Sequence, residues 1–244
     1  MANKFHNPWD VGGEYYNQNA LNTEFLPKDA AYFTGVNPNT GESVHDRRVD
    51  DKESIFDVLS IDSKGIISNS RIAIDIIKEI EKGPLRSVIG IILHRTASST
   101  GKSTINAFKT GRDGVNYGTH FLVDEFGNIL QTASLNYYTL HVGKTRKKSY
   151  PQNTNSIGIE VVGNYSVNNG WDPLTANQID ATTWLTGSLL QTYNLGKNDV
   201  YSHDVISYKT AGEGTIIYNA IMPTIRREGL LRRSDFSGHS GIIY

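Results

Sequence analysis

Two short apolar runs rich in β-branched residues constrain the fold more than any other feature of the sequence. Residues 88–93 (Val-Ile-Gly-Ile-Ile-Leu) and 156–162 (Ser-Ile-Gly-Ile-Glu-Val-Val) are each bounded by turn residues. Runs of this length and composition predict buried strands. Segments with helical spacing lie around them, so we predict an α/β fold with a mixed central β-sheet flanked by helices.

Further elements are predicted from local patterns. The predicted helices cover about residues 70–82, 175–193 and 216–225. Isoleucines recur at helical spacing in the first of them, and Thr175 forms a capping box with Gln178 at the start of the second. The additional strands are a hairpin formed by residues 119–124 and 128–132, and a short strand at residues 200–202.

The chain is expected to have three parts. Residues 1–85 form an irregular N-terminal extension packed on the core, because they begin with a long stretch rich in Asn, Asp, Gly and Tyr that has little periodicity. Residues 86–226 form the α/β domain. Residues 227–244 form a polar C-terminal tail.

Composition excludes several classes of site and partner. The sequence has no cysteine, which excludes disulfides, thiolate metal sites and a cysteine nucleophile. Its net charge of −1 gives no global attraction to nucleic acid, so no nucleic-acid partner is expected. The basic cluster at residues 144–148 (Lys-Thr-Arg-Lys-Lys) is a local exception, and its pattern is more typical of a solvated loop than of a polyanion site.

The sequence also predicts where the chain is made. No run approaches the length needed to cross a bilayer, so no transmembrane segment is expected. The first ten residues lack the apolar core of a signal peptide. We therefore expect synthesis in the cytoplasm without a signal peptide, and delivery by another route if the protein acts elsewhere.

Two histidines at the ends of predicted strands indicate a metal site. His94 follows residues 88–93, and His203 follows residues 200–202. Sites in α/β folds collect at the carboxyl ends of strands, and a catalytic zinc needs three protein ligands and one open position. Either histidine alone would be typical of a hydrogen-bonded strand end. Together with Glu213, a nearby carboxylate, and Glu160, an acid within an apolar strand, they predict a hydrolytic metal site.

Five short motifs follow one another along the chain. They are residues 92–97 (Ile-Leu-His-Arg-Thr-Ala), 117–131 (Tyr-Gly-Thr-His-Phe-Leu-Val-Asp-Glu-Phe-Gly-Asn-Ile-Leu-Gln), 140–143 (Leu-His-Val-Gly), 155–160 (Asn-Ser-Ile-Gly-Ile-Glu), and Ser202-His203-Asp204 with Lys209-Thr210. In this order the motifs resemble the zinc-dependent N-acetylmuramoyl-L-alanine amidases of the type 2 group, which are related to peptidoglycan recognition proteins. Each motif is weak alone, but the ordered set is specific and covers roughly residues 86–226.

The resemblance implies roles for individual residues. His94 and His203 would bind Zn²⁺, Glu160 would handle the protons of the attacking water, and Lys209 would stabilise the oxyanion. His141 would lie near the substrate groove, and Tyr117 and Thr96, which stand in matching motifs, are predicted to contact substrate. His120 is expected to pack or form hydrogen bonds and not to bind metal.

The third metal ligand departs from the family pattern. The family usually has Asp or Cys two residues after the lysine, where this chain has Ala211. Glu213 is the favoured replacement, because its longer side chain could reach the metal from a Gly-Glu-Gly turn. Asp204 is the alternative, and a carboxylate at the start of the last helix is another role open to Glu213.

The expected function is zinc-dependent hydrolysis of the amide bond between N-acetylmuramic acid and L-alanine in peptidoglycan. The alternatives are a module that binds muropeptide without cutting it, which the loss of a ligand at Ala211 would explain, and a cytosolic wall-recycling amidase. An antibacterial effector or phage-type lysin is preferred, acting in the periplasm or cell wall of a target bacterium. Its partners would then include an immunity protein or a secretion apparatus.

Overall fold

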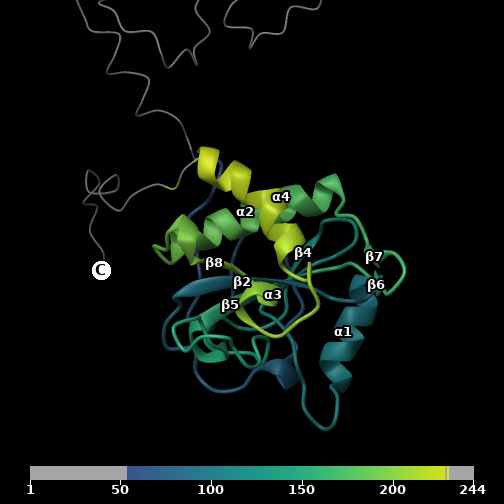
Figure 1. Ribbon diagram of the computed structural model, residues 1–244. Coiled ribbons are helices and arrows are strands. Elements are labelled where there is room, and N and C mark those ends of the chain that lie inside the picture. The colour runs from purple at the N-terminus through teal and green to yellow at the C-terminus, as the bar shows by residue number, and fades with distance from the viewer. Residues whose placement is uncertain (1–53, 229, 231–244) are drawn as a thin grey trace, which may run out of the picture. The chain divides into compact units, whose positions relative to one another are not determined.

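A six-stranded sheet forms the centre of the fold, which the computed structural model describes for residues 54–228 and 230 (Figure 1). The strand order is β1-β4-β3-β5-β2-β8. Only β3 and β4 pair antiparallel, and every other pairing in this sheet is parallel. The sheet consists of β1 (Ile72–Ile74), β2 (Gly90–Arg95), β3 (Phe121–Val123), β4 (Ile129–Gln131), β5 (Ser156–Val161) and β8 (Val200–Ser202). The predicted mixed α/β fold is confirmed.

Four α-helices and a small hairpin complete the described elements. The helices are α1 (Gly101–Thr110), α2 (Ala176–Thr192), α3 (His203–Ile206) and α4 (Thr215–Glu228). The hairpin consists of β6 (Tyr165–Ser166) and β7 (Gly170–Trp171), and single 3-10 turns occur at Lys78–Ile80, Asn153–Asn155 and Lys197–Asp199. None of the helices in the described part is both long enough and apolar enough to cross a membrane.

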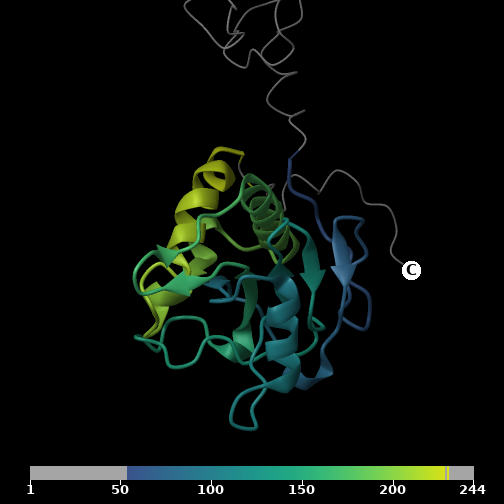
Figure 2. The ribbon, with the colours of Figure 1, turned by 90° about the vertical axis from the view of Figure 1, so that its right-hand side faces the viewer.

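Alternate residues of the central strands pack against different helices. Ile91 and Leu93 of β2 belong to the larger core cluster, together with buried side chains of α2 and α4. These two helices lie side by side in both views (Figures 1 and 2). Leu122 of β3 belongs to a second cluster with Ile105 and Phe108 of α1. Because side chains alternate along a strand, α1 covers the face opposite to α2 and α4.

The pairing of β2 with β5 positions two of the predicted site residues. The strands are parallel and in register over six residues, and His94 lies opposite Glu160. Both residues therefore project from the face of the sheet that also carries α1. Both strands are almost fully buried, which explains their continuous apolar sequences.

The capping box predicted at Thr175 begins α2. Its hydroxyl accepts a hydrogen bond from the Gln178 backbone N–H at 3.2 Å, and the Gln178 side chain accepts one from Thr175 N–H at 3.1 Å. The side-chain amide of Gln178 also donates to the Val162 carbonyl at 2.8 Å. The cap thus fixes the start of α2 to the end of β5, as well as to the helix itself.

The helix predicted over residues 70–82 is wrong. This segment contains β1, which pairs parallel with β4, and the 3-10 turn at Lys78–Ile80. Ile72, Ile74 and Ile76 also recur at every second position, which is the period of a strand, and β-branched residues favour strands. Helix α1 was not predicted, although Thr100 caps it by accepting a hydrogen bond from Ser103 N–H at 3.1 Å.

The other predicted elements are confirmed with small changes in their ends. The hairpin of β3 and β4, the strands β2, β5 and β8, and the helices α2 and α4 all occur. The predicted tail begins within α4, which continues to Glu228. Residues 1–53 of the predicted extension and 231–244 of the predicted tail lie outside the described residues, and the division of the chain at residues 85 and 226 stays a prediction.

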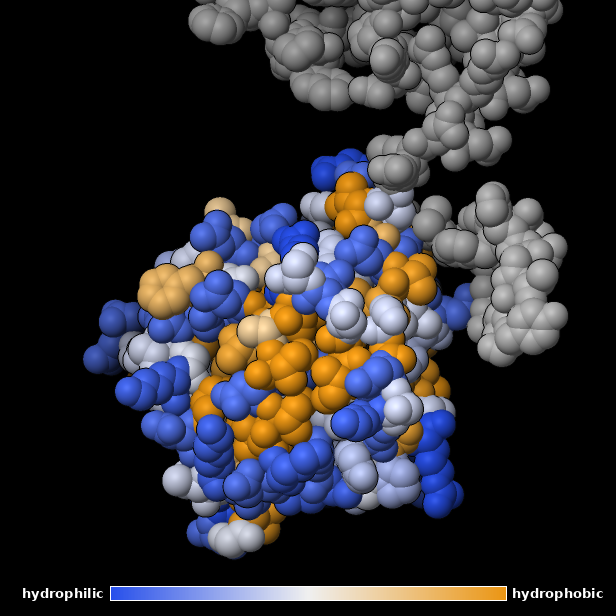
Figure 3. Space-filling view, turned by 180° about the vertical axis from the view of Figure 1, so that it is seen from behind, coloured by the Kyte–Doolittle hydropathy of each residue, from blue (hydrophilic) through white to orange (hydrophobic). Residues whose placement is uncertain are grey.

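Residues 54–59 lie along α2 and are fastened to it by polar side chains of the helix. Asp57 N–H donates to Ser188 Oγ at 3.0 Å, and Leu59 N–H donates to Thr192 Oγ1 at 2.8 Å. The side chain of Phe56 is buried in the larger core. Exposed apolar residues of the described part include Ile55, Val58, Ile74 and Ile89. Figure 3 shows apolar side chains gathered in the middle of the face seen from behind.

Candidate metal centre and active site

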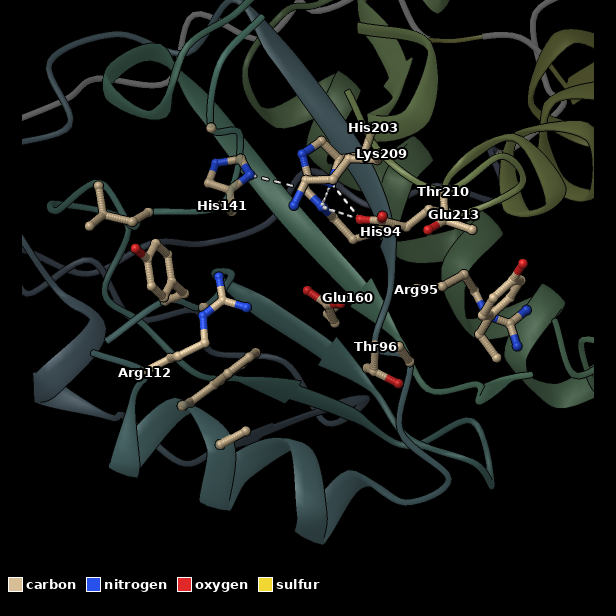
Figure 4. A pocket seen from close by; sticks show the side chains of 18 of the residues that line it. His94, Arg95, Thr96, Arg112, His141, Glu160, His203, Lys209, Thr210 and Glu213 are labelled. Atoms are coloured by element: carbon tan, nitrogen blue, oxygen red, sulfur yellow. Dashed lines mark hydrogen bonds and ion pairs between the residues drawn. The ribbon is translucent and has the colours of Figure 1, made fainter. Parts of the chain in front are cut away.

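One cavity of about 580 Å³ brings the predicted site residues together (Figure 4). It lies at the carboxyl ends of β2, β5 and β8, where His94, Glu160 and His203 stand. The residues lining it include all eight predicted to bind metal, bind substrate or take part in catalysis: His94, Thr96, Tyr117, His141, Glu160, His203, Lys209 and Glu213. Five separate segments of the chain contribute these side chains.

His94, His203 and Glu213 form a compact cluster in the wall of the cavity. The Nδ1 atoms of the two histidines are 2.7 Å apart, and Glu213 Oε1 is 2.6 Å from His203 Nδ1 and 3.9 Å from His94 Nδ1. The three atoms all lie within 4.8 Å of one another. Both imidazoles are buried, and Glu213 is partly buried.

The backbone fixes the tautomer of His203. Its Nε2 atom is 2.9 Å from the Val142 carbonyl oxygen, which can only accept a hydrogen bond. Nε2 therefore carries the hydrogen, and Nδ1 of the neutral ring keeps a lone pair. The hydroxyl of Ser207 donates to the same carbonyl at 2.8 Å, which holds this acceptor in place.

A chain of hydrogen bonds fixes the tautomer of His94 in the same way. Ser156 Oγ donates its hydrogen to the Gln152 carbonyl at 2.7 Å, so the same oxygen must accept from His141 Nε2 at 3.3 Å. The Nδ1 atom of His141 then holds a lone pair and accepts from His94 Nε2 at 3.0 Å. His94 is left with a lone pair on Nδ1, which faces His203.

The cluster therefore brings three possible ligand atoms close together. Both Nε2 atoms bond away from the cluster, so the Nδ1 atoms are the ring nitrogens that face one another and the Glu213 carboxylate. Burial, and then the neighbouring His203, lower the pKa of His94 well below its usual value, which keeps that ring neutral. Two imidazole nitrogens and one carboxylate oxygen are a zinc ligand set, and a cation there would satisfy all three atoms.

Asp204, the alternative third ligand, has a different role in the structure. Its carboxylate accepts hydrogen bonds from the backbone N–H groups of Gly212, Gly214 and Thr215 at 2.8–2.9 Å, and from the Thr215 hydroxyl at 2.8 Å. These bonds hold the turn that carries Glu213 and cap the start of α4. Asp204 thus points toward the backbone, and Glu213 is the carboxylate that reaches the histidines.

The small hairpin braces the other side of the same turn. Trp171 of β7 donates from its indole Nε1 to the Ala211 carbonyl at 2.9 Å. The guanidinium of Arg95 lies 5.8 Å from the Trp171 ring and donates to the Asp172 carbonyl at 3.0 Å. Burial lowers the pKa of Arg95, an effect that Asp172 opposes. Sequence reasoning did not find Trp171, because no spacing rule links it to the turn at Ala211.

Glu160 points into the cavity beside the histidines (Figure 4). Its pKa is raised to about 8, mainly by burial and further by the negative charge of Glu213, while Lys209 acts in the opposite direction. A carboxyl group tuned to this range can both accept and return a proton near neutral pH.

Of the remaining histidines, His120 is held by the backbone as the sequence indicated. Its Nδ1 accepts from Gly158 N–H at 3.2 Å, and its Nε2 donates to the Tyr137 carbonyl at 3.0 Å. Burial lowers the pKa of His120 to about 4. His141 is also buried but lines the cavity, where its ring lies edge-on to that of His94.

The other predicted contact residues, Thr96 and Tyr117, also line the cavity. Thr96 Oγ1 accepts from Gly163 N–H at 3.1 Å and donates to the Ser98 carbonyl at 3.0 Å, so it also braces the loop after β2. Tyr117 is exposed, and the guanidinium of Arg112 lies 5.6 Å from its ring. Figure 4 shows Arg112 pointing into the cavity, a position that the sequence did not predict.

Comparison with known proteins identifies the family. Residues 84–215 match the sequence profile described as N-acetylmuramoyl-L-alanine amidase, which covers more than half of the 244-residue chain. The chain belongs to the N-acetylmuramoyl-L-alanine amidase family. The matched range of this amidase-family protein includes His94, Glu160, His203, Lys209 and Glu213. A search of curated protein sequences found no match.

Solved structures of amidases share the fold. A selenomethionine derivative of AmpD aligns with a TM-score of 0.53 at 17% identity, covering 66% of this chain and 98% of that one. The amidase endolysin LysCS from Clostridium intestinale URNW aligns with a TM-score of 0.51 at 17% identity, covering 65% and 97%. A mutant form of PlyL gives a TM-score of 0.50 at 16% identity, covering 64% and 98%.

The hydrogen bonds behind His94 give the first prediction. Ser156→Ala removes the acceptor for His141 Nε2, so His141 can change tautomer and no longer holds the Nδ1 lone pair of His94 toward the cluster. We expect the affinity for Zn²⁺ to fall about tenfold, measured by competition with a chromophoric chelator. Ser63→Ala, at an exposed position, is the matched control. If Ser156→Ala and the control bind Zn²⁺ with equal affinity, Ser156 does not orient His94 through His141.

The raised pKa of Glu160 gives a second prediction, for the metal-free protein. Between the ordinary value of 4.5 and about 8, the folded protein keeps a proton that the unfolded chain has released, so stability falls as pH rises. Glu160→Gln does not titrate. Its Tm advantage over the unmodified protein should therefore widen from pH 5 to pH 8 and stay constant above that.

Thermal unfolding with a chelator present measures this difference. Glu79→Gln, which changes an exposed acid, is the matched control. A Tm difference for Glu160→Gln that is the same at pH 5 and pH 8 would show that Glu160 does not hold its proton in the folded state.

Proposed function

We propose that the protein is a zinc-dependent amidase that hydrolyses the bond between N-acetylmuramic acid and L-alanine in peptidoglycan. The observation that carries the proposal is the proximity of three possible ligand atoms, from His94, His203 and Glu213, in the cavity that Glu160 and Lys209 also line. Family membership supports the amide bond as the target, and the ligand set supports zinc.

The residues of the cluster would hold the metal through His94 Nδ1, His203 Nδ1 and the Glu213 carboxylate. When bound there, zinc supplies positive charge that lowers the pKa of a water molecule toward about 7, polarises the amide carbonyl and favours the ionised form of Glu160. A zinc held by these three residues would keep one position for water, which is the arrangement of catalytic sites.

Glu160 is the proton carrier in this proposal. Its carboxylate accepts a proton from the attacking water and returns it to the nitrogen of the leaving L-alanine. The amide C–N bond breaks as the new C–O bond forms, and the products are a free carboxylic acid and a free amine. Lys209 offers its ammonium group to the negative charge that develops on the carbonyl oxygen.

Substrate would be held by the remaining predicted residues. His141, Tyr117 and Thr96 line the same cavity. Tyr117 is exposed and offers an aromatic face to a sugar or peptide. These roles are part of the proposal, as are the roles of the metal ligands.

Glu213 also bears on the non-catalytic alternative. The reason to consider a module that only binds muropeptide was Ala211, which cannot bind a metal. Glu213 lies two residues further along, and its carboxylate is 2.6 Å from His203 Nδ1. This contact supports a complete ligand set, and the nearby Glu160 has no role in a module that only binds.

The proposal is tested by incubating the metal-loaded protein with purified peptidoglycan and identifying the soluble products by mass spectrometry. We expect free stem peptides and intact glycan strands, and no release when a chelator is present. His203→Ala should lose both metal and activity, whereas Glu160→Ala should keep the metal and lose at least about 100-fold in turnover. Intact peptidoglycan that retains bound protein would instead favour a recognition module.

We also propose where the enzyme acts. Its substrate polymer lies outside the cytoplasmic membrane, so we propose an antibacterial effector or phage-type lysin that works in the periplasm or wall of a target cell. An immunity protein or a secretion apparatus would then belong to its partners. Expression in a bacterial host should cause lysis only when a signal sequence directs the protein to the periplasm. Equal lysis from the cytoplasm would contradict this role.

A further inference from the structure

A basic surface borders the cavity and is built from two segments far apart in the sequence. We call it the basic face and define it by Lys144, Arg146, Lys147, Lys148 and Tyr208. All five side chains are exposed. The segments are joined by a β-bridge between Thr145 and Ser207 and by a hydrogen bond from Arg146 N–H to the Ile206 carbonyl at 2.7 Å.

Among the described residues, the positive charges of the basic face have no acidic partners. The sequence contains no Asp or Glu between Glu125 and Glu160, and none from residue 205 to residue 212. Within the described residues, no ion pair involves any of its four cations. The whole chain has a net charge of only −1, so this positive potential is local.

Aromatic rings and backbone groups hold some of these cations in place. The Arg146 guanidinium lies 4.6 Å from the ring centre of Tyr208, and its Nε donates to the Ser207 carbonyl at 2.9 Å. Lys144 also lies over Tyr208, and Lys147 lies 5.6 Å from the ring centre of Tyr150. A solvated loop does not need its cations ordered in this way.

The basic face is continuous with the rim of the cavity. Gly143 and Lys209 line the cavity, and they are the immediate chain neighbours of Lys144 and Tyr208. A polymer whose amide bond lies beside the histidine cluster extends out of the cavity, and the basic face is one of the borders that it can cross. The part of a muropeptide beyond the scissile bond is a peptide that carries free carboxylates.

We propose that the basic face binds the carboxylates of peptidoglycan stem peptides and holds the polymer while its amide bond lies in the cavity. This inference rests on the proposed amidase function. Each exposed contact of this kind is weak, but several cations of one sign add and are screened by salt. The basic face therefore contributes to substrate affinity, and the chemical step depends on the cavity.

The test variant is Lys144→Gln/Lys147→Gln/Lys148→Gln, which keeps Arg146 and its backbone bonds. The control variant is Lys64→Gln/Arg86→Gln/Lys102→Gln, which removes the same charge from exposed positions elsewhere. Both are assayed as metal-loaded enzymes, and their Tm values verify folding. On peptidoglycan stripped of attached phosphate polymers, we expect the KM of the test variant to rise about three- to tenfold at low salt, with kcat unchanged.

Three comparisons complete the experiment. The rise in KM should disappear in about 0.5 M NaCl, where charges are strongly screened. It should also disappear on a substrate whose peptide carboxylates are amidated. The control variant should have the same KM as the unmodified enzyme in every condition. Equal KM values for test and control variants at low salt would overturn the proposal. A rise in KM that occurs only on cell walls that keep their phosphate polymers would also overturn it, because the basic face would then bind phosphate and not peptide carboxylates. Absence of hydrolysis by the unmodified enzyme would instead contradict the proposed function.

Discussion

The parallel pairing of β2 with β5 is the constraint on which the site depends. Its register sets His94 opposite Glu160, and a slip of either strand by one residue would turn that strand's side chain to the opposite face of the sheet and separate the pair. Gly158 contributes to the same arrangement, because a Cβ atom there would lie 2.7 Å from His141 Nδ1. The glycine leaves room for the imidazole that hydrogen-bonds to His94. The same two strands therefore build the core on one face of the sheet and place His94 and Glu160 on the other.

Local sequence patterns predicted those parts of the fold whose signals are local. The strands around His94 and Glu160, the β3–β4 hairpin and the Thr175 cap are each encoded in a few adjacent residues. The segment containing Ile72 was assigned wrongly because its isoleucines fit both a helical and an alternating period. Its conformation is decided by β4, more than fifty residues further along the chain, which β1 pairs with. No single window of sequence contains that information.

The candidate site was predictable to a similar extent. The motifs brought forward seven of the eight predicted residues that line the cavity, and Glu213 was added as the nearest carboxylate after Ala211. The choice between Asp204 and Glu213 depends on which carboxylate meets backbone N–H groups, and only the folded turn shows that. The groups that orient the two imidazoles are the carbonyl of Val142 and the hydroxyl of Ser156. The role of a backbone carbonyl cannot be predicted from the residue type, and a single serine gives almost no indication of its partner.

Strand β1 affects where a shortened form of the domain can begin. It covers the outer edge of β4, and it lies before residue 84, where the family match begins. A chain that started at that residue would present the N–H and C=O groups of β4 to solvent, and exposed edges of this kind recruit strands from other molecules. It would also lose Phe56, whose ring is buried against α2. The segment before the family match thus moves the edge of the sheet from β4 to the three-residue strand β1, and a domain shortened to the family match would be expected to aggregate more readily.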